Sequence, residues 1–129
     1  MKFIDRQEEY RRLNRLHQLA GGGLVVLYGR RRIGKSHLLI RWCQETGGVY
    51  TVGDTSAASL QRQAMAVAIS TRYPGFAEVI YPTWRALLNA LSDRAKTENW
   101  HGPVVFDEFP YLVASDQTLP GVFQAWVDE

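Results

Sequence analysis

The sequence predicts an α/β domain built on a parallel sheet. Three short apolar runs, at 24–28, 49–52 and 104–106, are too short for helices and are typical of buried strands. Each run is followed by a stretch whose apolar residues have helical spacing, and this alternation favours parallel strands joined by helices. The 129 residues suffice for one domain, and 46% hydrophobic with 22% charged residues is an ordinary globular composition.

Turn residues separate the expected helices. The first helix begins at a capping-box pattern, Asp5 with Glu8, and ends at the glycines 21–23. A later stretch has the clearest apolar stripe of the chain, in which Trp84 is the first residue. The expected helices span 5–20, 35–46, 56–70, 83–96 and a final segment that contains 119–127.

Charge and cysteine content exclude several classes of protein. The formal net charge is +2, and basic residues do not alternate with aromatic ones, so a nucleic-acid partner is not indicated. The single cysteine, Cys43, cannot form an intrachain disulfide and fits a reducing compartment. No apolar run approaches the ~20 residues that span a bilayer. We expect a cytoplasmic chain without a signal peptide or a membrane partner.

The stretch after the first expected strand carries the motif G-x-x-x-x-G-K-[ST]. In such a loop the backbone N–H groups point at phosphate oxygens, and the N-terminus of the next helix adds partial positive charge. Lys35 would reach the β- and γ-phosphates of a nucleotide and take part in catalysis, and the Ser36 hydroxyl would ligate Mg²⁺. The alternative is a glycine-rich turn that contains a lysine by chance. For the three arginines of the motif, the alternative to a phosphate contact is exposure to solvent. The expected phosphate-binding residues are Gly29, Arg30, Arg31, Arg32, Ile33, Gly34, Lys35, Ser36 and His37.

An acidic pair follows the third apolar run. Ligands gather at the carboxyl edge of an open parallel sheet, so Asp107 is expected to hold the Mg²⁺ shell. Glu108 would orient or deprotonate the attacking water as a catalytic residue. The alternative is a pair of carboxylates that cap the following turn.

Taken together, these stretches resemble the archaeal-type ATPases, a P-loop group related to the AAA+ and STAND ATPases. The resemblance extends from Phe3 to the C-terminus and implies a P-loop NTPase fold with three α/β/α layers. It also implies ATP or ADP as the nucleotide, Mg²⁺ as the cofactor, and Phe3, Ile4 and Arg6 near the adenine. The segments that carry it are Phe3-Ile4-Asp5-Arg6 with Glu9, the loop at 28–36 and the run from Phe106 to Leu112.

The resemblance further implies that the domain is incomplete. In that branch another strand lies between the phosphate-loop strand and the Asp107 strand, and it comes after the last helix of this chain. We therefore expect 1–129 to be the N-terminal part of one ATPase domain, with a helical segment at 1–22 and a nucleotide-binding core at 23–129. The missing strand, the arginine finger and the lid would belong to a C-terminal region of the parent protein. The chain alone is expected to be a weak or inactive ATPase that is either marginally stable or self-associated, with a homo-oligomer as one partner state.

Two functions remain open at this stage. The parent protein could be an ATP-hydrolysing enzyme that drives a motor or remodelling reaction. It could instead be a nucleotide-gated switch in signalling or defence, with slow turnover. A third reading, an interaction domain with a vestigial loop, is disfavoured because Lys35, Ser36, Asp107 and Glu108 are all present.

Overall fold

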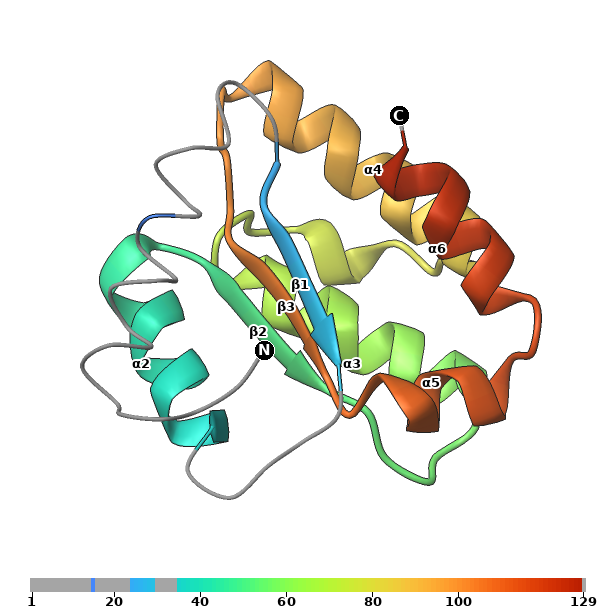
Figure 1. Cartoon of the computed structure of the whole chain (residues 1–129). Helices are drawn as coiled ribbons and strands as arrows, with labels where there is room; N and C mark the ends of the chain where they lie inside the picture. Colours follow the sequence, from blue (N-terminus) through green and yellow to red (C-terminus); the bar gives the residue numbers. More distant parts are fainter. Residues whose placement is uncertain (1–14, 16–23, 30–34, 129) are drawn as a thin grey trace.

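A computed structural model describes residue 15, residues 24–29 and residues 35–128. The described residues form a mixed α/β structure with a parallel three-stranded sheet, which confirms the α/β class and the parallel strands (Figure 1). The helix expected at 5–20 lies outside the described residues, apart from residue 15. The elements are β1 (Val26–Gly29), α2 (Lys35–Thr46), β2 (Val49–Val52), α3 (Ala58–Ser70), the 3₁₀ turn η1 (Phe76–Glu78), α4 (Trp84–Thr97), β3 (Val104–Asp107), α5 (Phe109–Ser115) and α6 (Leu119–Val127).

The helices follow the local signals of the sequence closely. α4 begins after Thr83, whose hydroxyl accepts a hydrogen bond from the backbone N–H of Ala86 at 3.1 Å. All five residues of its expected stripe are buried. α4 is also the longest helix among the described residues, and none there is long and apolar enough to cross a membrane. The buried stripe consists of Trp84, Leu87, Leu88, Leu91 and Ala95.

The segment after β3 differs from the expectation of a single helix. It contains two helices, and α5 has Pro110 in its first turn, where a missing N–H costs no hydrogen bond. The chain then turns at Asp116, whose side-chain oxygen accepts hydrogen bonds from the backbone N–H and the hydroxyl of Thr118. This turn starts α6 in a new direction.

The order of the strands corrects one expectation. The sheet has the order β1-β3-β2, so no strand lies between β1 and β3. Val26 pairs with Val104, and the register continues to Gly29 opposite Asp107. The expectation of another strand between 24–28 and 104–106 is therefore wrong for this structure. The facing backbone groups of β1 and β3 satisfy one another directly, and the gap for an intervening strand does not exist.

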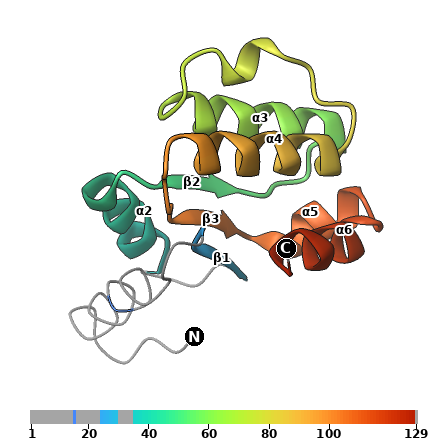
Figure 2. The same cartoon turned by 90° about the horizontal axis from the view of Figure 1, so that it is seen from above.

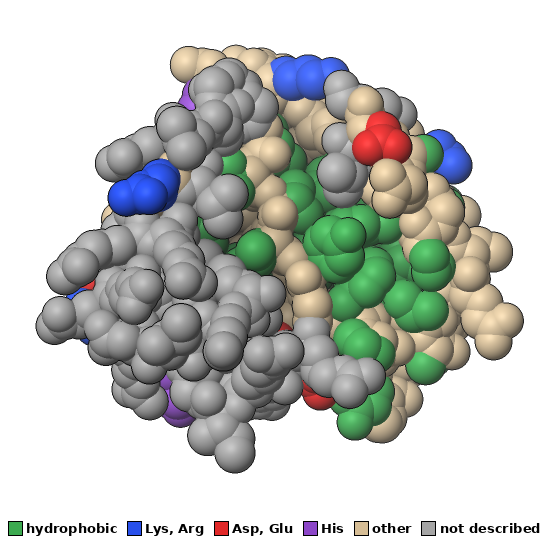
Figure 3. Space-filling view, viewed as in Figure 1, with side chains coloured by type: hydrophobic (Ala, Val, Ile, Leu, Met, Phe, Trp, Pro, Cys, Tyr) green, Lys and Arg blue, Asp and Glu red, His purple; other side chains and the backbone are tan. Residues whose placement is uncertain are grey.

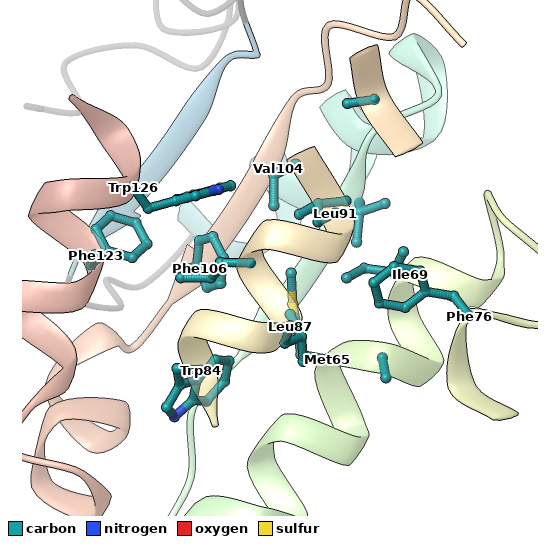
Figure 4. Close-up of a cluster of buried hydrophobic side chains, with 14 of the residues drawn as sticks. Met65, Ile69, Phe76, Trp84, Leu87, Leu91, Val104, Phe106, Phe123 and Trp126 are labelled. Carbon is teal, nitrogen blue, oxygen red and sulfur yellow. The ribbon is translucent and has the colours of Figure 1, made fainter. Parts of the chain in front are cut away.

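The two faces of the sheet are covered by different helices. Val104 and Phe106 point into a large core shared with α3, α4 and α6, whereas Val105 points the other way, toward α2. Figure 1 shows α2 on one side of the sheet and α4 and α6 on the other, and Figure 2 shows α3 and α4 side by side. Figure 4 shows the larger core, in which Met65 and Leu87 meet between α3 and α4. The α2 side is completed by the buried stripe of Leu38, Leu39, Trp42 and Cys43.

Aromatic rings connect β1 to the last two helices. The ring of Tyr28 lies 5.1 Å from that of Phe109 and 4.8 Å from that of Phe123, measured between centroids. Tyr28 is nevertheless 52% exposed. Figure 3 shows hydrophobic side chains gathered between β1 and α6 on this face. The contacts attach α5 and α6 to β1 near the end of the strand, where the candidate site lies.

Candidate functional site

The candidate site lies at the carboxyl edge of the sheet. Gly29 ends β1, Val52 ends β2, and both are register partners of Asp107, the last residue of β3. In parallel sheets this edge is the usual position of ligands. A small hollow lies here, too narrow to hold a water molecule, and it is lined by Leu27, Tyr28, Gly29, Leu39, Val105, Phe106 and Asp107.

Asp107 is buried, with 2% of its surface exposed. The Tyr50 hydroxyl donates a hydrogen bond to its Oδ2 at 2.6 Å, and the backbone N–H of Glu108 donates to its Oδ1 at 3.0 Å. The bond from Glu108 is local, because it comes from the next residue along the chain. The bond from Tyr50, however, comes from another strand and fixes the carboxylate at the edge of the sheet.

Glu108 adopts an unusual backbone conformation. Its φ of 53° and ψ of 44° lie in the left-handed region, which costs a residue with a Cβ ~1–2 kcal/mol. It occupies the position before α5, yet its side chain makes no capping hydrogen bond to that helix. Its carbonyl oxygen accepts from the backbone N–H of Tyr111 at 3.0 Å. Strain of this kind clusters at functional sites, where the surrounding structure holds it in place.

The phosphate-loop motif is only partly described. Gly29 is in place beside Asp107, whereas Arg30, Arg31, Arg32, Ile33 and Gly34 lie outside the described residues. Lys35 and Ser36 form the start of α2, but their side chains are not among those described. His37 is exposed on the same helix. Leu39, one turn into α2, lines the same hollow as Gly29 and Asp107, so the N-terminal half of α2 borders the site.

The loop between β2 and α3 also supports the carboxyl edge of the sheet, and the sequence patterns did not indicate this. The buried side chain of Gln61 accepts a hydrogen bond from the backbone N–H of Asp54 at 2.9 Å. It donates to the carbonyl oxygens of Ser56 at 3.1 Å and of Tyr111 at 3.4 Å. Hydrogen bonds from Ser56 also lower the pKa of the exposed Asp54 carboxyl. Gln61 thus links the β2–α3 loop to α5 next to the acidic pair.

The sequence patterns did not identify two more residues of the site, Tyr50 and Gly53. Tyr50 was assigned only to a short strand, and its bond to Asp107 depends on which strands are neighbours. Gly53 follows that strand, and its backbone N–H donates to the carbonyl oxygen of Asp107 at 2.9 Å. Its position after an apolar run was a signal for a tight turn, but the sequence did not reveal what lies against it.

Comparison with known proteins gives one relative and no family. The chain is 29% identical over 128 residues to the uncharacterized protein MJECL04 of Methanocaldococcus jannaschii. The match covers 98% of this chain and 26% of that protein, so the chain spans about a quarter of its relative's length. No family model matches, and no solved structure matches.

Proposed function

We propose that this chain belongs to the P-loop ATPases and binds ATP with Mg²⁺ at the carboxyl edge of its sheet. One observation carries the proposal: Gly29, the first residue of the motif, is the register partner of Asp107. A phosphate-binding motif and a buried carboxylate thus meet at the edge where parallel sheets bind ligands. The motif itself lies between a strand and a helix, as phosphate loops do.

Each candidate residue has a definite role in this proposal. Residues 29–37 surround the phosphates with backbone N–H groups, and the Lys35 ammonium neutralises charge on the β- and γ-phosphates. Glu108 orients or deprotonates the water that attacks the γ-phosphate. Its strained backbone conformation supports this role, because strain of this kind clusters at functional sites.

The donor set suits Mg²⁺. This ion prefers oxygen ligands and is usually held by one or two carboxylates together with substrate phosphates and waters. The Asp107 carboxylate and the Ser36 hydroxyl supply oxygens, and Asp107 is already oriented by two hydrogen bonds. No group of three or more metal-ligating side chains occurs in the part of the chain that the structure describes. When bound, Mg²⁺ would neutralise developing charge between the β- and γ-phosphates.

The activity of the whole protein is part of the proposal. We propose that the whole protein is an ATP-hydrolysing enzyme in the cytoplasm. The alternative is a nucleotide-gated switch with slow turnover, which would use the same phosphate site. The rate of hydrolysis separates the two: a switch binds ATP as well as an enzyme does but hydrolyses it far more slowly.

Calorimetric titration of ATP in MgCl₂ and in EDTA tests the proposal. Lys35→Ala should weaken binding at least tenfold, because it removes the cation opposite the phosphates. Lys96→Ala is the matched control, since Lys96 is exposed in the last turn of α4, which leads to the opposite end of β3. Equal affinities for the wild type and Lys35→Ala would reject the site.

A further inference from the structure

We infer that Tyr50 is a positioning residue for Asp107 and that its hydroxyl sets the Mg²⁺ dependence of nucleotide binding. The inference rests on the proposed function and extends it to a residue outside both motifs. It starts from one contact, the 2.6 Å hydrogen bond from the Tyr50 hydroxyl to Oδ2 of Asp107.

The register of the sheet explains why these two side chains meet. Tyr50 on β2 pairs with Val105 on β3, and Asp107 lies two residues farther along β3. Residues two apart point to the same face of a strand, so all three side chains lie on the α2 side of the sheet. Diagonal neighbours on adjacent strands are within reach of a long side chain. Tyrosine is long enough to extend its hydroxyl to the carboxyl edge.

The ring of Tyr50 is itself held in place. It packs against the cluster formed by Val105 and the buried side of α2, which includes Leu39 and Trp42. The hydroxyl is therefore a fixed donor. The other carboxylate oxygen receives the backbone N–H of Glu108 at 3.0 Å. With a donor on each oxygen, rotation of the carboxylate is restricted.

Restricted rotation of the Asp107 carboxylate affects the binding of Mg²⁺ more than the binding of the nucleotide itself. Mg²⁺ demands near-ideal octahedral geometry, so a carboxylate that turns freely is a poorer partner. Loss of a residue that orients a metal-binding side chain typically lowers metal affinity ~10–100-fold. ATP without metal is bound by the loop and the start of α2, which Tyr50 does not form. Removal of the hydroxyl should thus change the metal dependence and leave metal-free binding intact.

Tyr50→Phe is the direct test, and Tyr81→Phe is its matched control. Tyr81 is also partly buried, and its hydroxyl donates to the carbonyl oxygen of Phe76 at 2.9 Å, outside the candidate site. Calorimetry measures ATP affinity in EDTA and then across a series of MgCl₂ concentrations. We expect Tyr50→Phe to keep its affinity in EDTA within twofold and to need ~10-fold more Mg²⁺ for half-maximal enhancement. Tyr81→Phe should match the wild type in its ATP affinity in EDTA and in its Mg²⁺ requirement.

The outcomes are separable. An unchanged Mg²⁺ requirement in Tyr50→Phe would overturn the inference while the wild type still supports the proposed function. Equal weakening in EDTA and in MgCl₂ would show a merely structural role and overturn it as well. A wild type without Mg²⁺-dependent binding would reject the proposed function and this inference together.

Discussion

A Cβ atom on Gly53 would lie 2.6 Å from the backbone carbonyl oxygen of Glu108. It would also lie 3.2 Å from side-chain atoms of Tyr111 and Leu112. Side chains can move away from such a contact, but the carbonyl oxygen belongs to the strained residue that starts α5. The β2–α3 loop therefore packs directly against the backbone of the acidic pair, and only glycine fits there.

Gly53→Ala should lower the free energy of unfolding by ~1–3 kcal/mol, because the added methyl group overpacks a close contact. Urea unfolding measures this loss. Gly121→Ala is the opposite control and should stabilise the protein by up to ~1 kcal/mol, since alanine replaces glycine in a helix with open space around it. If Gly53→Ala unfolds at the same urea concentration as the wild type, the packing described here is wrong.

Glu108→Gln tests the role of the second acidic residue. The amide keeps the size of the side chain and removes its ability to accept a proton. We expect ATP binding to persist while hydrolysis falls at least 100-fold. Phosphate release by the full-length parent protein is the measurement, with Lys35→Ala as the background control. Hydrolysis at the wild-type rate would make Glu108 a structural residue only.

Glu108→Gly addresses the backbone strain separately from the chemistry. Glycine adopts φ of 53° without the Cβ clash, so this variant should gain ~0.5–1 kcal/mol of stability after its greater chain entropy is counted. Asn99→Gly is the matched control, because Asn99 has the same φ and lies in a turn after α4. Asparagine tolerates the left-handed region better than glutamate, so Asn99→Gly should gain less stability than Glu108→Gly. A loss of stability in Glu108→Gly would mean that its side chain contributes more than the strain costs.

Local patterns predicted the elements well because their causes are local. The stripe from Trp84 to Ala95 is buried as the helical spacing requires, and the run at 104–106 is a fully buried strand. Gly29 and Asp107 could also be placed at one edge, since the carboxyl ends of parallel strands share it. Which strands are neighbours depends on contacts far apart in sequence. For this reason the direct pairing of β1 with β3 and the bond from Tyr50 to Asp107 emerged only from the structure.

Cys43 makes the stability of the protein sensitive to alkaline pH. Its thiol is buried on the α2 side of the sheet, and burial raises its pKa from 9.0 to about 12. The thiolate forms in the unfolded chain above pH 9 but is disfavoured in the folded protein. The thiol's contribution to stability is therefore complete below pH 9 and is lost as the pH rises toward 12.

We expect the wild type to lose up to ~1.4 kcal/mol of unfolding free energy per pH unit in this range, beyond the loss seen in Cys43→Ala. Urea unfolding at pH 8, 9, 10 and 11 measures the two slopes. Tyrosine and lysine titrations are common to both proteins and cancel in the difference between them. Below pH 9, thiol-directed reagents should modify Cys43 rapidly in urea and slowly in the native protein, because only the thiolate reacts. Identical slopes for the two proteins, or equally fast labelling in native buffer, would place the thiol in solvent and contradict its burial against Val105.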